Sequence, residues 1–581
     1  MKNATKILFI QLIIYISSVA MTFESGEISG TWTTYDSPYY ITDSVYIPGN
    51  DSLVIEPGCS IIFLGNYKFI VDSNAVLKAI GTEADSIYFT SMDTSVGHHG
   101  MRFIYPAAGC TLEYCRIEFG KASGDSFWDS YGGGIFLFFG NLVINHCLIT
   151  HNEANAEGGG IYSLSSNLTL LNSEICNNKT IMFSHITGAG GGLFINDYYE
   201  NYSEIYGNYF HNNYSEVGGG IVCSGANVEI CKNRFINNYA LLEHTEGFGG
   251  AIYILDSNPI VDGNVIAYNY ASCGAGIGIL SVNYSSSLFF NNLIYNNEAD
   301  SCGGGLWISC ECCSSIIMNN TINHNSAVTG GGIYAEGGRD IIIINTVFSD
   351  NEAQYGSEIY VGSNMWSPFN IFLSHNNIDS ALCYAELSSC LFVWAYGNFT
   401  SIPVFSDSLL HLDDISPCID AGACSVYVSF WDSTIYAPSY DIDSFPRPYG
   451  DNWDVGAYEW HEGNIDRNYK PPSKSFIFAC PNPFNSSCVI FVETQNLASP
   501  IDIAIYDLRG NVIYELSPLS SNSFLPEEKG ESFPLLGERE TQRVRGQFTW
   551  TPDKSIASGI YLVRATTQDG HTITKRIVYL K

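Results

Sequence analysis

A glycine-rich pattern that recurs through the middle of the chain constrains the fold more than any other feature of the sequence. Between residues 131 and 362, a triplet rich in glycine is followed nine times by an aliphatic residue, and the last copy is degenerate. Successive aliphatic positions lie 25 to 32 residues apart, at Ile135, Ile161, Leu193, Ile221, Ile252, Ile277, Leu306, Ile333 and Ile359. A period in this range predicts a solenoid, in which each repeat covers the apolar surface of its neighbours.

A second pattern keeps step with the glycines. An apolar residue lies three positions before an asparagine, and these asparagines are Asn152, Asn178, Asn213, Asn238, Asn269, Asn297, Asn325 and Asn351. Equivalent side chains of stacked coils lie about 4.8 Å apart. An amide at that spacing can donate to one neighbour and accept from the other, and asparagine also tolerates a left-handed corner. We therefore expect ladders of asparagine at the corners of the solenoid.

Short apolar runs separate these corners, for example at residues 142–144 and 341–344. Their length and their content of β-branched residues are typical of strands, and no segment of the repeat region has a sustained helical period. The sequence therefore predicts an all-β chain whose middle part is a parallel β-helix, followed by a small β-sandwich at the C-terminus.

The repeats resemble a known family. Phe235–Asn238 and Gly249–Ile252 match the two halves of the repeat motif of polymorphic outer-membrane proteins, which are surface-exposed, adhesin-like β-helices. The resemblance covers residues 131–362. It implies a right-handed parallel β-helix with a binding role at a cell surface.

The chain on either side of the repeats divides into further segments. Residues 1–20 carry an early positive charge, an apolar core and a small-residue cleavage site, which predict a secretory signal and no transmembrane span. Residues 21–130 are expected to form an N-terminal cap and the first coils, and residues 363–465 the exit coils and a cap. A cap is needed because an open solenoid end exposes strand edges and apolar core.

Residues 466–474 contain Pro471-Pro472 and are interpreted as a linker to a separate module at residues 475–581. Four segments of this module, Pro481–Asn485, Ile505–Gly510, Ala557–Tyr561 and Lys575–Lys581, resemble the type A sorting domain of the type IX secretion system. Such domains direct passage across the outer membrane and are usually removed when the protein is attached to the cell surface. The resemblance implies the type IX machinery as a partner. It also implies a location that is secreted or on the outer surface of a Gram-negative-type bacterium.

The net charge of the chain narrows the classes of molecule that we expect it to bind. The chain has 59 acidic and 25 basic residues, for a formal net charge of −34. A negative surface of this kind argues against nucleic acid as a partner. A polysaccharide or another cell-surface ligand is the expected partner, and no cofactor is expected.

Many parallel β-helices are polysaccharide lyases or hydrolases, so enzymatic chemistry is the alternative. A uronate lyase needs cations and a basic residue, and the cations between residues 130 and 400 are Lys179, Lys232, Arg234 and Arg339. Lys232 and Arg234 are the candidate pair, and a solvated pair on one coil is the competing interpretation.

A hydrolase needs two carboxylates, for which Asp413 and Asp414 are adjacent but lie in a predicted turn. His98-His99 lacks a recognisable nucleophile. We therefore favour a non-catalytic protein.

The 18 cysteines offer local disulfides at Cys383/Cys390, Cys418/Cys424 and Cys480/Cys488. Cys310 and Cys313 have the spacing of zinc ligands, but no second pair completes such a site. We expect no metal.

The residue after each repeat aliphatic is the best binding feature. Seven of the nine are aromatic, and they are Phe136, Tyr162, Phe194, Tyr253, Trp307, Tyr334 and Tyr360, with Val222 and Gly278 as the exceptions. If the aliphatic residues face the core, strand alternation places these rings outside, in a stripe roughly 38 Å long. Aromatic faces with polar edges suit sugar rings. The alternative is an aromatic ladder that is covered by loops or only stabilises the sheet.

Overall fold

A computed structural model describes residues 22–461, except 125–126, 182–187, 200, 242–246, 284, 312, 338–339, 363–368 and 387–389. Beyond these it describes residue 556 and seven strands between residues 476 and 579. The signal peptide predicted at residues 1–20 lies outside the described residues, as does the whole of the linker predicted at residues 466–474. The described chain is all-β, apart from the four-residue helix α1 (Phe127–Ser130) and a 3-10 turn at Ser380–Leu382.

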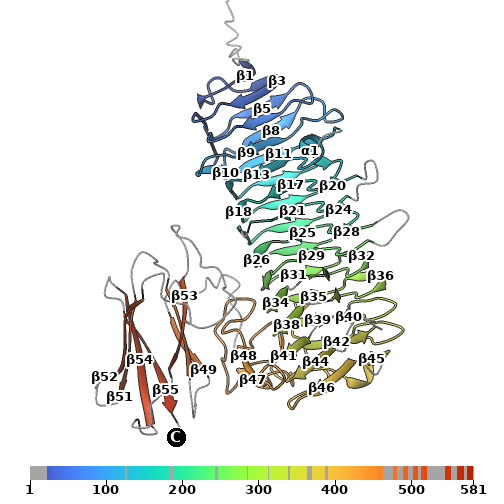
Figure 1. Cartoon of the computed structure of the whole chain (residues 1–581), viewed down its shortest axis with the longest axis vertical. Helices are drawn as coiled ribbons and strands as arrows, with labels where there is room; N and C mark the ends of the chain where they lie inside the picture. Colours follow the sequence, from blue (N-terminus) through green and yellow to red (C-terminus); the bar gives the residue numbers. More distant parts are fainter. Residues whose placement is uncertain are drawn as a thin grey trace, which may run out of the picture.

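Residues 22–394 wind into a parallel β-solenoid, which Figure 1 shows as coils stacked along the long axis from β1 to β46. A full coil passes through four strands, each of which pairs in parallel with its equivalent on the next coil. We number the four stacks sheets 1 to 4 in the order in which the chain enters them. The predicted parallel β-helix is therefore confirmed.

The strands of the four sheets have the following bounds. Sheet 1 contains β6 (Phe69–Val71), β9 (Met101–Ile104), β13 (Ile135–Phe138), β17 (Ile161–Leu164), β21 (Leu193–Asn196), β25 (Ile221–Ser224), β29 (Ile252–Leu255), β33 (Ile277–Ser281), β37 (Leu306–Cys310), β40 (Ile333–Gly337), β43 (Ile359–Val361) and β45 (Cys383–Ala385). Sheet 2 contains β2 (Gly30–Trp32), β4 (Ser52–Ile55), β7 (Val76–Ile80), β10 (Cys110–Glu113), β14 (Asn141–Asn145), β18 (Asn167–Leu171), β22 (Tyr202–Tyr206), β26 (Asn227–Cys231), β30 (Ile260–Asp262), β34 (Ser286–Phe290), β38 (Ser314–Met318), β41 (Asp340–Ile344), β44 (Phe369–Ser374) and β46 (Cys390–Trp394). Sheet 3 contains β5 (Ser60–Phe63), β8 (Ile87–Ser91), β11 (Cys115–Glu118), β15 (Leu148–Thr150), β19 (Glu174–Cys176), β23 (Tyr209–His211), β27 (Arg234–Ile236), β31 (Val265–Ala267), β35 (Leu293–Tyr295), β39 (Thr321–Asn323) and β42 (Val347–Ser349). Sheet 4 contains β12 (Lys121–Ala122), β16 (Glu153–Ala154), β20 (Lys179–Thr180), β24 (Tyr214–Ser215), β28 (Tyr239–Ala240), β32 (Tyr270–Cys273) and β36 (Glu298–Cys302).

Sheets 1 and 3 meet at the N-terminal end of the solenoid. The long strand β3 (Tyr39–Ile47) pairs through its first half with β5 and through its second half with β6, and β1 (Thr22–Glu27) pairs with β3. Beyond β3 the two sheets separate, and the coil acquires its interior.

That interior is filled by the apolar residues of both sequence patterns. The aliphatic residue after each glycine triplet faces inward from sheet 1, for example Ile135, and the apolar residue of the asparagine motif faces inward from sheet 3, for example Phe210 and Phe235. The rings of Phe210 and Phe235 stack with centroids 5.0 Å apart. Equivalent side chains thus pack on each other from coil to coil.

The asparagines form the predicted ladder. Each side-chain Nδ2 donates to Oδ1 of the next asparagine, at 2.9–3.1 Å, from Asn152 through to Asn351. A second ladder runs from Asn208 to Asn320 with distances of 2.9–3.1 Å. The left-handed backbone lies one residue before each motif asparagine, as at Asn177 and Asn237, rather than on the ladder residue itself.

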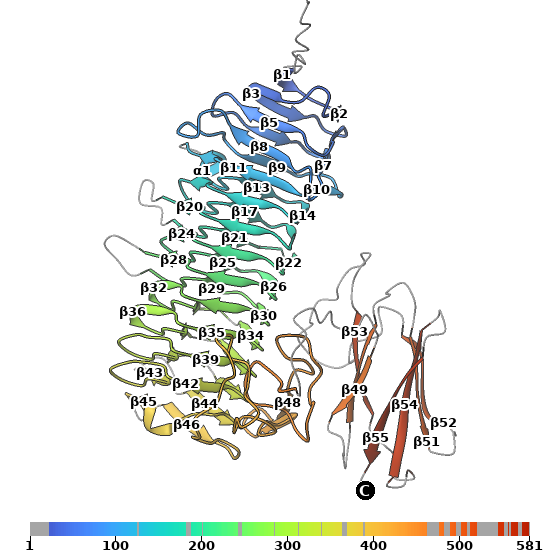
Figure 2. The same cartoon turned by 180° about the vertical axis from the view of Figure 1, so that it is seen from behind.

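The chain leaves the stack after Phe399, which still pairs in parallel with Asn377 of the preceding coil. Residues 395–461, which we call the exit segment, include the hairpin of β47 (Ser425–Val428) and β48 (Ser433–Tyr436). Figures 1 and 2 show that this segment turns back along the outside of the last coils instead of closing only their end. Val428 and Trp453 pack on outward residues of sheet 2, and Ile442 and Tyr458 on outward residues of sheet 3.

The C-terminal strands form two antiparallel sheets. One contains β49 (Phe476–Cys480), β50 (Cys488–Thr494) and β53 (Val544–Trp550). The other contains β52 (Val512–Leu519), β51 (Ile501–Asp507), β54 (Gly559–Thr567) and β55 (Thr572–Tyr579) in that order.

Candidate functional site

The aromatic residues that follow the repeat aliphatics stack on the outward side of sheet 1. The ring centroids of Phe136 and Tyr162 are 5.6 Å apart with an interplanar angle of 11°, and those of Tyr162 and Phe194 are 5.5 Å apart. Tyr334 and Tyr360 repeat the arrangement at 5.3 Å. Phe136, Tyr162 and Phe194 belong to a hydrophobic cluster separate from the interior, and Tyr334 packs against it. They therefore point away from the core, as strand alternation predicts.

The stripe is nevertheless not exposed on the outer surface, and the arrangement corresponds to the alternative of a covered aromatic ladder. The exposed fraction is at most 7% for Phe136, Tyr162, Phe194, Tyr253, Trp307 and Tyr360, and Tyr334 is half-buried. The first glycine of each triplet, at positive φ, folds the chain against the ring, so that a Cβ on Gly158 would lie 2.7 Å from Cβ of Tyr162. Side chains just before the glycines, such as Phe248, complete the cover. The structure therefore gives no support to ligand contact by these seven side chains.

A different row of side chains is exposed along sheet 4. Register pairing aligns one residue from each strand, and these are Lys121, Glu153, Lys179, Tyr214, Tyr239, Tyr270 and Glu298. We call this set the sheet 4 row. Tyr214 and Tyr239 are each 38% exposed. From Glu153 onward each member directly follows a ladder asparagine, but sequence reasoning missed the row because the residue type at this position varies from coil to coil.

The sheet 4 row begins at a pocket on the corner between sheets 3 and 4. The pocket is lined by Thr94, Phe119, Lys121, His151, Asn152, Glu153, Asn177 and Lys179. The rings of Phe119 and His151 lie 5.6 Å apart. Lys179 pairs with Glu153 at 2.8 Å, and Nζ of Lys121 donates to the carbonyl of Ser95. The pocket lining thus contains two lysines and one glutamate, and the charge of Lys121 also interacts with that of nearby Asp93.

The candidate lyase pair is divided between two structural contacts. Lys232 lies at a left-handed corner, and its Nζ donates to the backbone oxygens of Ile442 at 2.6 Å and Asp441 at 3.4 Å. The guanidinium of Arg234 lies 5.0 Å above the ring of Tyr209. Lys232 therefore holds the exit segment on the solenoid. The competing interpretation, in which both side chains are only solvated, also does not describe Lys232.

The two histidines of the first coils are structural. His98 and His99 are buried, and burial lowers the pKa of each to about 3. Nδ1 of His98 accepts from the amide of Gly100, so its Nε2–H donates to the carbonyl of Glu118. Buried Arg102 donates to the carbonyl of His99. These bonds hold the first coils together.

The adjacent carboxylates Asp413 and Asp414 lie in a turn, as predicted. The backbone oxygen of Asp413 accepts from the amide of Ser416, and its amide donates to Val404. A hydrogen bond with Asp413, together with its charge, raises the pKa of the exposed Asp414. The two carboxyl groups contact each other on the surface, which is not the arrangement of two carboxylates on either side of a substrate bond.

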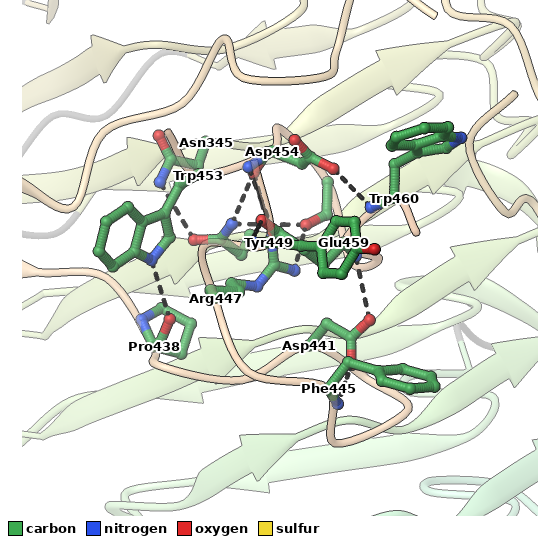
Figure 3. A network of polar contacts seen from close by, with 12 residues as sticks. Asn345, Pro438, Asp441, Phe445, Arg447, Tyr449, Trp453, Asp454, Glu459 and Trp460 are labelled. Atoms are coloured by element: carbon green, nitrogen blue, oxygen red, sulfur yellow. Dashed lines mark hydrogen bonds and ion pairs between the residues drawn. The ribbon is translucent and has the colours of Figure 1, made fainter. Parts of the chain in front are cut away.

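A buried polar network, drawn in Figure 3, fixes the end of the exit segment. Arg447 is fully buried and pairs with Glu459 at 3.0 Å, while its other nitrogen donates to the carbonyls of Gly456 and Ala457. Asp441 accepts from the amides of Phe445 and Glu459. Each of these partners belongs to the exit segment itself. The network of Arg447, Glu459 and Asp441 therefore has a structural role, and we call it the clasp.

A histidine lies between two carboxylates beside this clasp. Nδ1 of His411 is 2.8 Å from Asp407, its Nε2 is 3.2 Å from Asp443, and its ring is 3.9 Å from that of Tyr458. Burial lowers the pKa of His411, but the hydrogen bonds and charges of Asp443 and Asp407 outweigh burial and raise it overall.

The cysteines pair differently from the local pairs considered in the sequence. Cys310 and Cys313 form a disulfide, whereas Cys383 and Cys418 are not disulfide-bonded. The pairs Cys383/Cys390 and Cys418/Cys424 are therefore not formed. The side chains of Cys480/Cys488 lie outside the described residues.

The solenoid and its repeats place the chain in a family. The profile described as a right handed beta helix region matches residues 79–248 and 243–378, which together span more than half of the chain. The chain belongs to this family of right-handed β-helix proteins. Comparison with curated proteins and with solved structures found no match. In the part of the chain that the structure describes, no helix has the length and apolar character needed to span a membrane.

Proposed function

We propose that this protein is a secreted, cell-surface β-helix that binds polysaccharide without cleaving it. The observation that carries the proposal is the sheet 4 row, in which Tyr214 and Tyr239 are exposed on neighbouring coils and lead toward the lysine-lined pocket. Strand pairing spaces the tyrosines about 4.8 Å apart. A ladder of flat rings with polar edges suits a chain of sugar rings.

The two ends of the row suit different parts of such a ligand. Tyr270 keeps its hydroxyl on Asp300 at 2.6 Å, which fixes the direction of its ring. At the other end, Lys121 and Lys179 offer ammonium groups beside the Phe119 and His151 rings. We therefore place neutral sugars on the tyrosines and an acidic substituent, where the polysaccharide has one, at the pocket.

A non-catalytic role is supported by the contacts of the candidate catalytic residues. Lys232 is bonded to the exit segment, Arg234 lies on Tyr209, and His98 and His99 are buried. A lyase or hydrolase is the alternative function, and its signature is cleavage of the bound polysaccharide.

Export is part of the proposal. The described strands contain parts of three motif segments, at residues 505–507 on β51, 559–561 on β54 and 575–579 on β55, and β49 contacts β55. We propose that the two sheets pack as a β-sandwich and act as a type A sorting domain that brings the protein through the type IX machinery to the cell surface.

The binding proposal is tested with full-length protein against panels of neutral and acidic polysaccharides. Tyr214→Ala with Tyr239→Ala should weaken binding roughly tenfold, on the basis of about 0.5–1.5 kcal/mol per aromatic contact. The matched control is Tyr198→Ala with Tyr199→Ala, two tyrosines that are 72% and 67% exposed and lie outside the row. Equal losses in both variants, no binding to any polysaccharide, or depolymerisation by the wild-type protein would contradict the proposal.

A further inference from the structure

Three side chains with different metal-binding atoms meet on the outward face of sheet 3. Glu174 and Cys176 come from β19, and His211 comes from β23 on the next coil. One ligand atom from each lies within 4.8 Å of the other two. Nε2 of His211 is 2.9 Å from Oε1 of Glu174, and Sγ of Cys176 is 3.6 Å from the same oxygen.

The solenoid holds these side chains on rigid backbone. Cys176 and His211 are register partners in the parallel pairing of β19 and β23. Glu174 lies two residues before Cys176, so both side chains leave the same face of the strand. The intervening Ile175 and its partner Phe210 are fully buried in the interior. The cluster is therefore built on two paired strands whose opposite face is anchored in the core.

From this geometry we propose that Glu174, Cys176 and His211 bind a divalent ion of the zinc type, with a fourth position open to water or a ligand. Carboxylate oxygen, thiolate sulfur and imidazole nitrogen are the ligands that zinc takes in proteins, whereas calcium and magnesium prefer oxygen alone. Bond lengths of about 2.0–2.3 Å in a tetrahedron separate ligand atoms by roughly 3.5 Å. The Cys176–Glu174 distance matches that value, and the His211–Glu174 hydrogen bond needs to lengthen by about half an ångström.

The neighbours of the cluster suit the same role. The Oγ1 of Thr150, on the preceding coil, lies 3.2 Å from Sγ of Cys176. The Asn212 amide lies 2.9 Å from Nδ1 of His211. With its amide turned, Asn212 accepts from Nδ1–H and leaves the Nε2 lone pair for the metal, which is the usual support of a ligating histidine. Tyr209 stacks on the imidazole at 4.2 Å and limits rotation of its ring.

A simpler interpretation is a histidine–glutamate hydrogen bond beside an unrelated thiol. In that interpretation the thiol of Cys176 keeps its proton and donates a hydrogen bond to Oγ1 of Thr150. A bound divalent ion would displace that proton and create a thiolate. The two interpretations therefore differ in a property that can be measured, because only the metal site forms a metal–thiolate bond.

The chain contains a matched control for this test. Glu229-Ile230-Cys231 on β26 repeats the residues of Glu174-Ile175-Cys176. Cys231 pairs in register with Tyr206 and Asp262 and not with a histidine. The control therefore has the same tripeptide without the histidine, and among the described residues Glu229, Cys231 and Asp262 do not bring their ligand atoms within 4.8 Å of one another.

The test uses metal-free, full-length protein titrated with Co²⁺ in place of Zn²⁺. We expect a thiolate-to-cobalt absorption band that saturates at one equivalent and disappears when Zn²⁺ is added. Cys176→Ser should abolish the band, His211→Gln and Glu174→Gln should weaken cobalt binding at least tenfold, and Cys231→Ser should leave both unchanged. Absence of the band in the wild-type protein, or its persistence in Cys176→Ser, would overturn the proposal.

Because His211→Gln leaves Cys176 and Cys231 in place, it tests the site even if Cys176→Ser does not fold. Polysaccharide binding is measured in a separate experiment. Failure to bind cobalt therefore contradicts only the metal proposal, and failure to bind polysaccharide contradicts only the binding proposal.

Discussion

Glycine and asparagine, which recur in every repeat, act at different corners of the coil. The first glycine of each triplet adopts a positive φ, such as 69° at Gly158, and leaves no room for a Cβ beside the following aromatic residue. The ladder asparagines are buried and do not adopt the left-handed conformation; their amides bond coil to coil. A substitution at Gly158 therefore meets both backbone strain and a steric conflict, whereas one at Asn238 leaves buried polar groups of two coils unpaired.

The buried aromatic ladder predicts a stability effect at Trp307. Trp307→Ala with Tyr334→Ala should lower the free energy of unfolding by about 3 kcal/mol or more, because truncation of a buried aromatic residue removes its packing and leaves a cavity. Urea unfolding followed by circular dichroism measures this, with Tyr198→Ala as an exposed control. Unchanged stability together with lost polysaccharide binding would instead show that the rings reach the ligand.

Among the elements, the strands of the repeat could be predicted from the sequence, but the chain segments that cover the aromatic rings of sheet 1 could not. The triplet spacing and the asparagine motif identify which side chains face the core, because both follow from stacking of identical coils. The burial of Phe136 and Tyr162 depends on how Gly158 folds the chain across a ring, which strand alternation does not describe. The cluster of Glu174 and His211 joins residues 37 positions apart, so no local motif marks it.

Several buried or partly buried titratable groups link the stability of the exit segment to pH. His411 has a folded pKa above its ordinary value of about 6.5, so its bonds to Asp407 and Asp443 stabilise fully below that pH and weaken as the pH rises through the folded pKa. The buried carboxyls act in the same direction, because burial raises the pKa of Asp441 to about 6 and also raises the pKa of Glu459, against the opposing effect of the Arg447 charge. At a pH between the unfolded and the folded pKa, such a carboxyl group is protonated in the folded segment and ionised in the unfolded one, so the folded state loses stability as the pH rises.

Residues 395–461 should therefore be protected more strongly at pH 6 than at pH 8.5. Hydrogen exchange, corrected for the intrinsic rate at each pH, measures the protection. His411→Asn should lower protection at pH 6 and reduce the difference between the two conditions. Protection that increases toward pH 8.5 in the wild-type protein would contradict the assignment.

For the whole molecule, the solenoid and the C-terminal strands are expected to be separable. Each coil is stabilised by its neighbours, and the described exit segment packs on coils of the same solenoid. Deletion of residues 475–581 should thus leave the β-sheet spectrum and unfolding midpoint of the solenoid nearly unchanged.

The same deletion tests the proposed export route. The truncated protein should remain in the periplasm, which fractionation and protease treatment of intact cells can show. Surface display at the normal level would contradict the sorting assignment, whereas loss of the folded solenoid would contradict its independence.

The asparagine ladder also has a direction. Every ladder amide donates one hydrogen to the next asparagine toward the C-terminal end and its other hydrogen to a backbone carbonyl of the preceding coil, as Asn178 does to Asn213 and to Ile149. The Oδ1 of the first member therefore needs a donor from outside the ladder, and the last member needs an acceptor in place of a further asparagine. The amide of Gly120 donates to Asn152 at the start, and the carboxylate of Glu358 accepts from Asn351 at the end. Glu358 occupies the third position of the degenerate triplet, where the other copies have glycine or alanine. The irregular copy is thus a terminator, and repeats can be gained or lost by duplication between these two ends without leaving a buried amide unmatched.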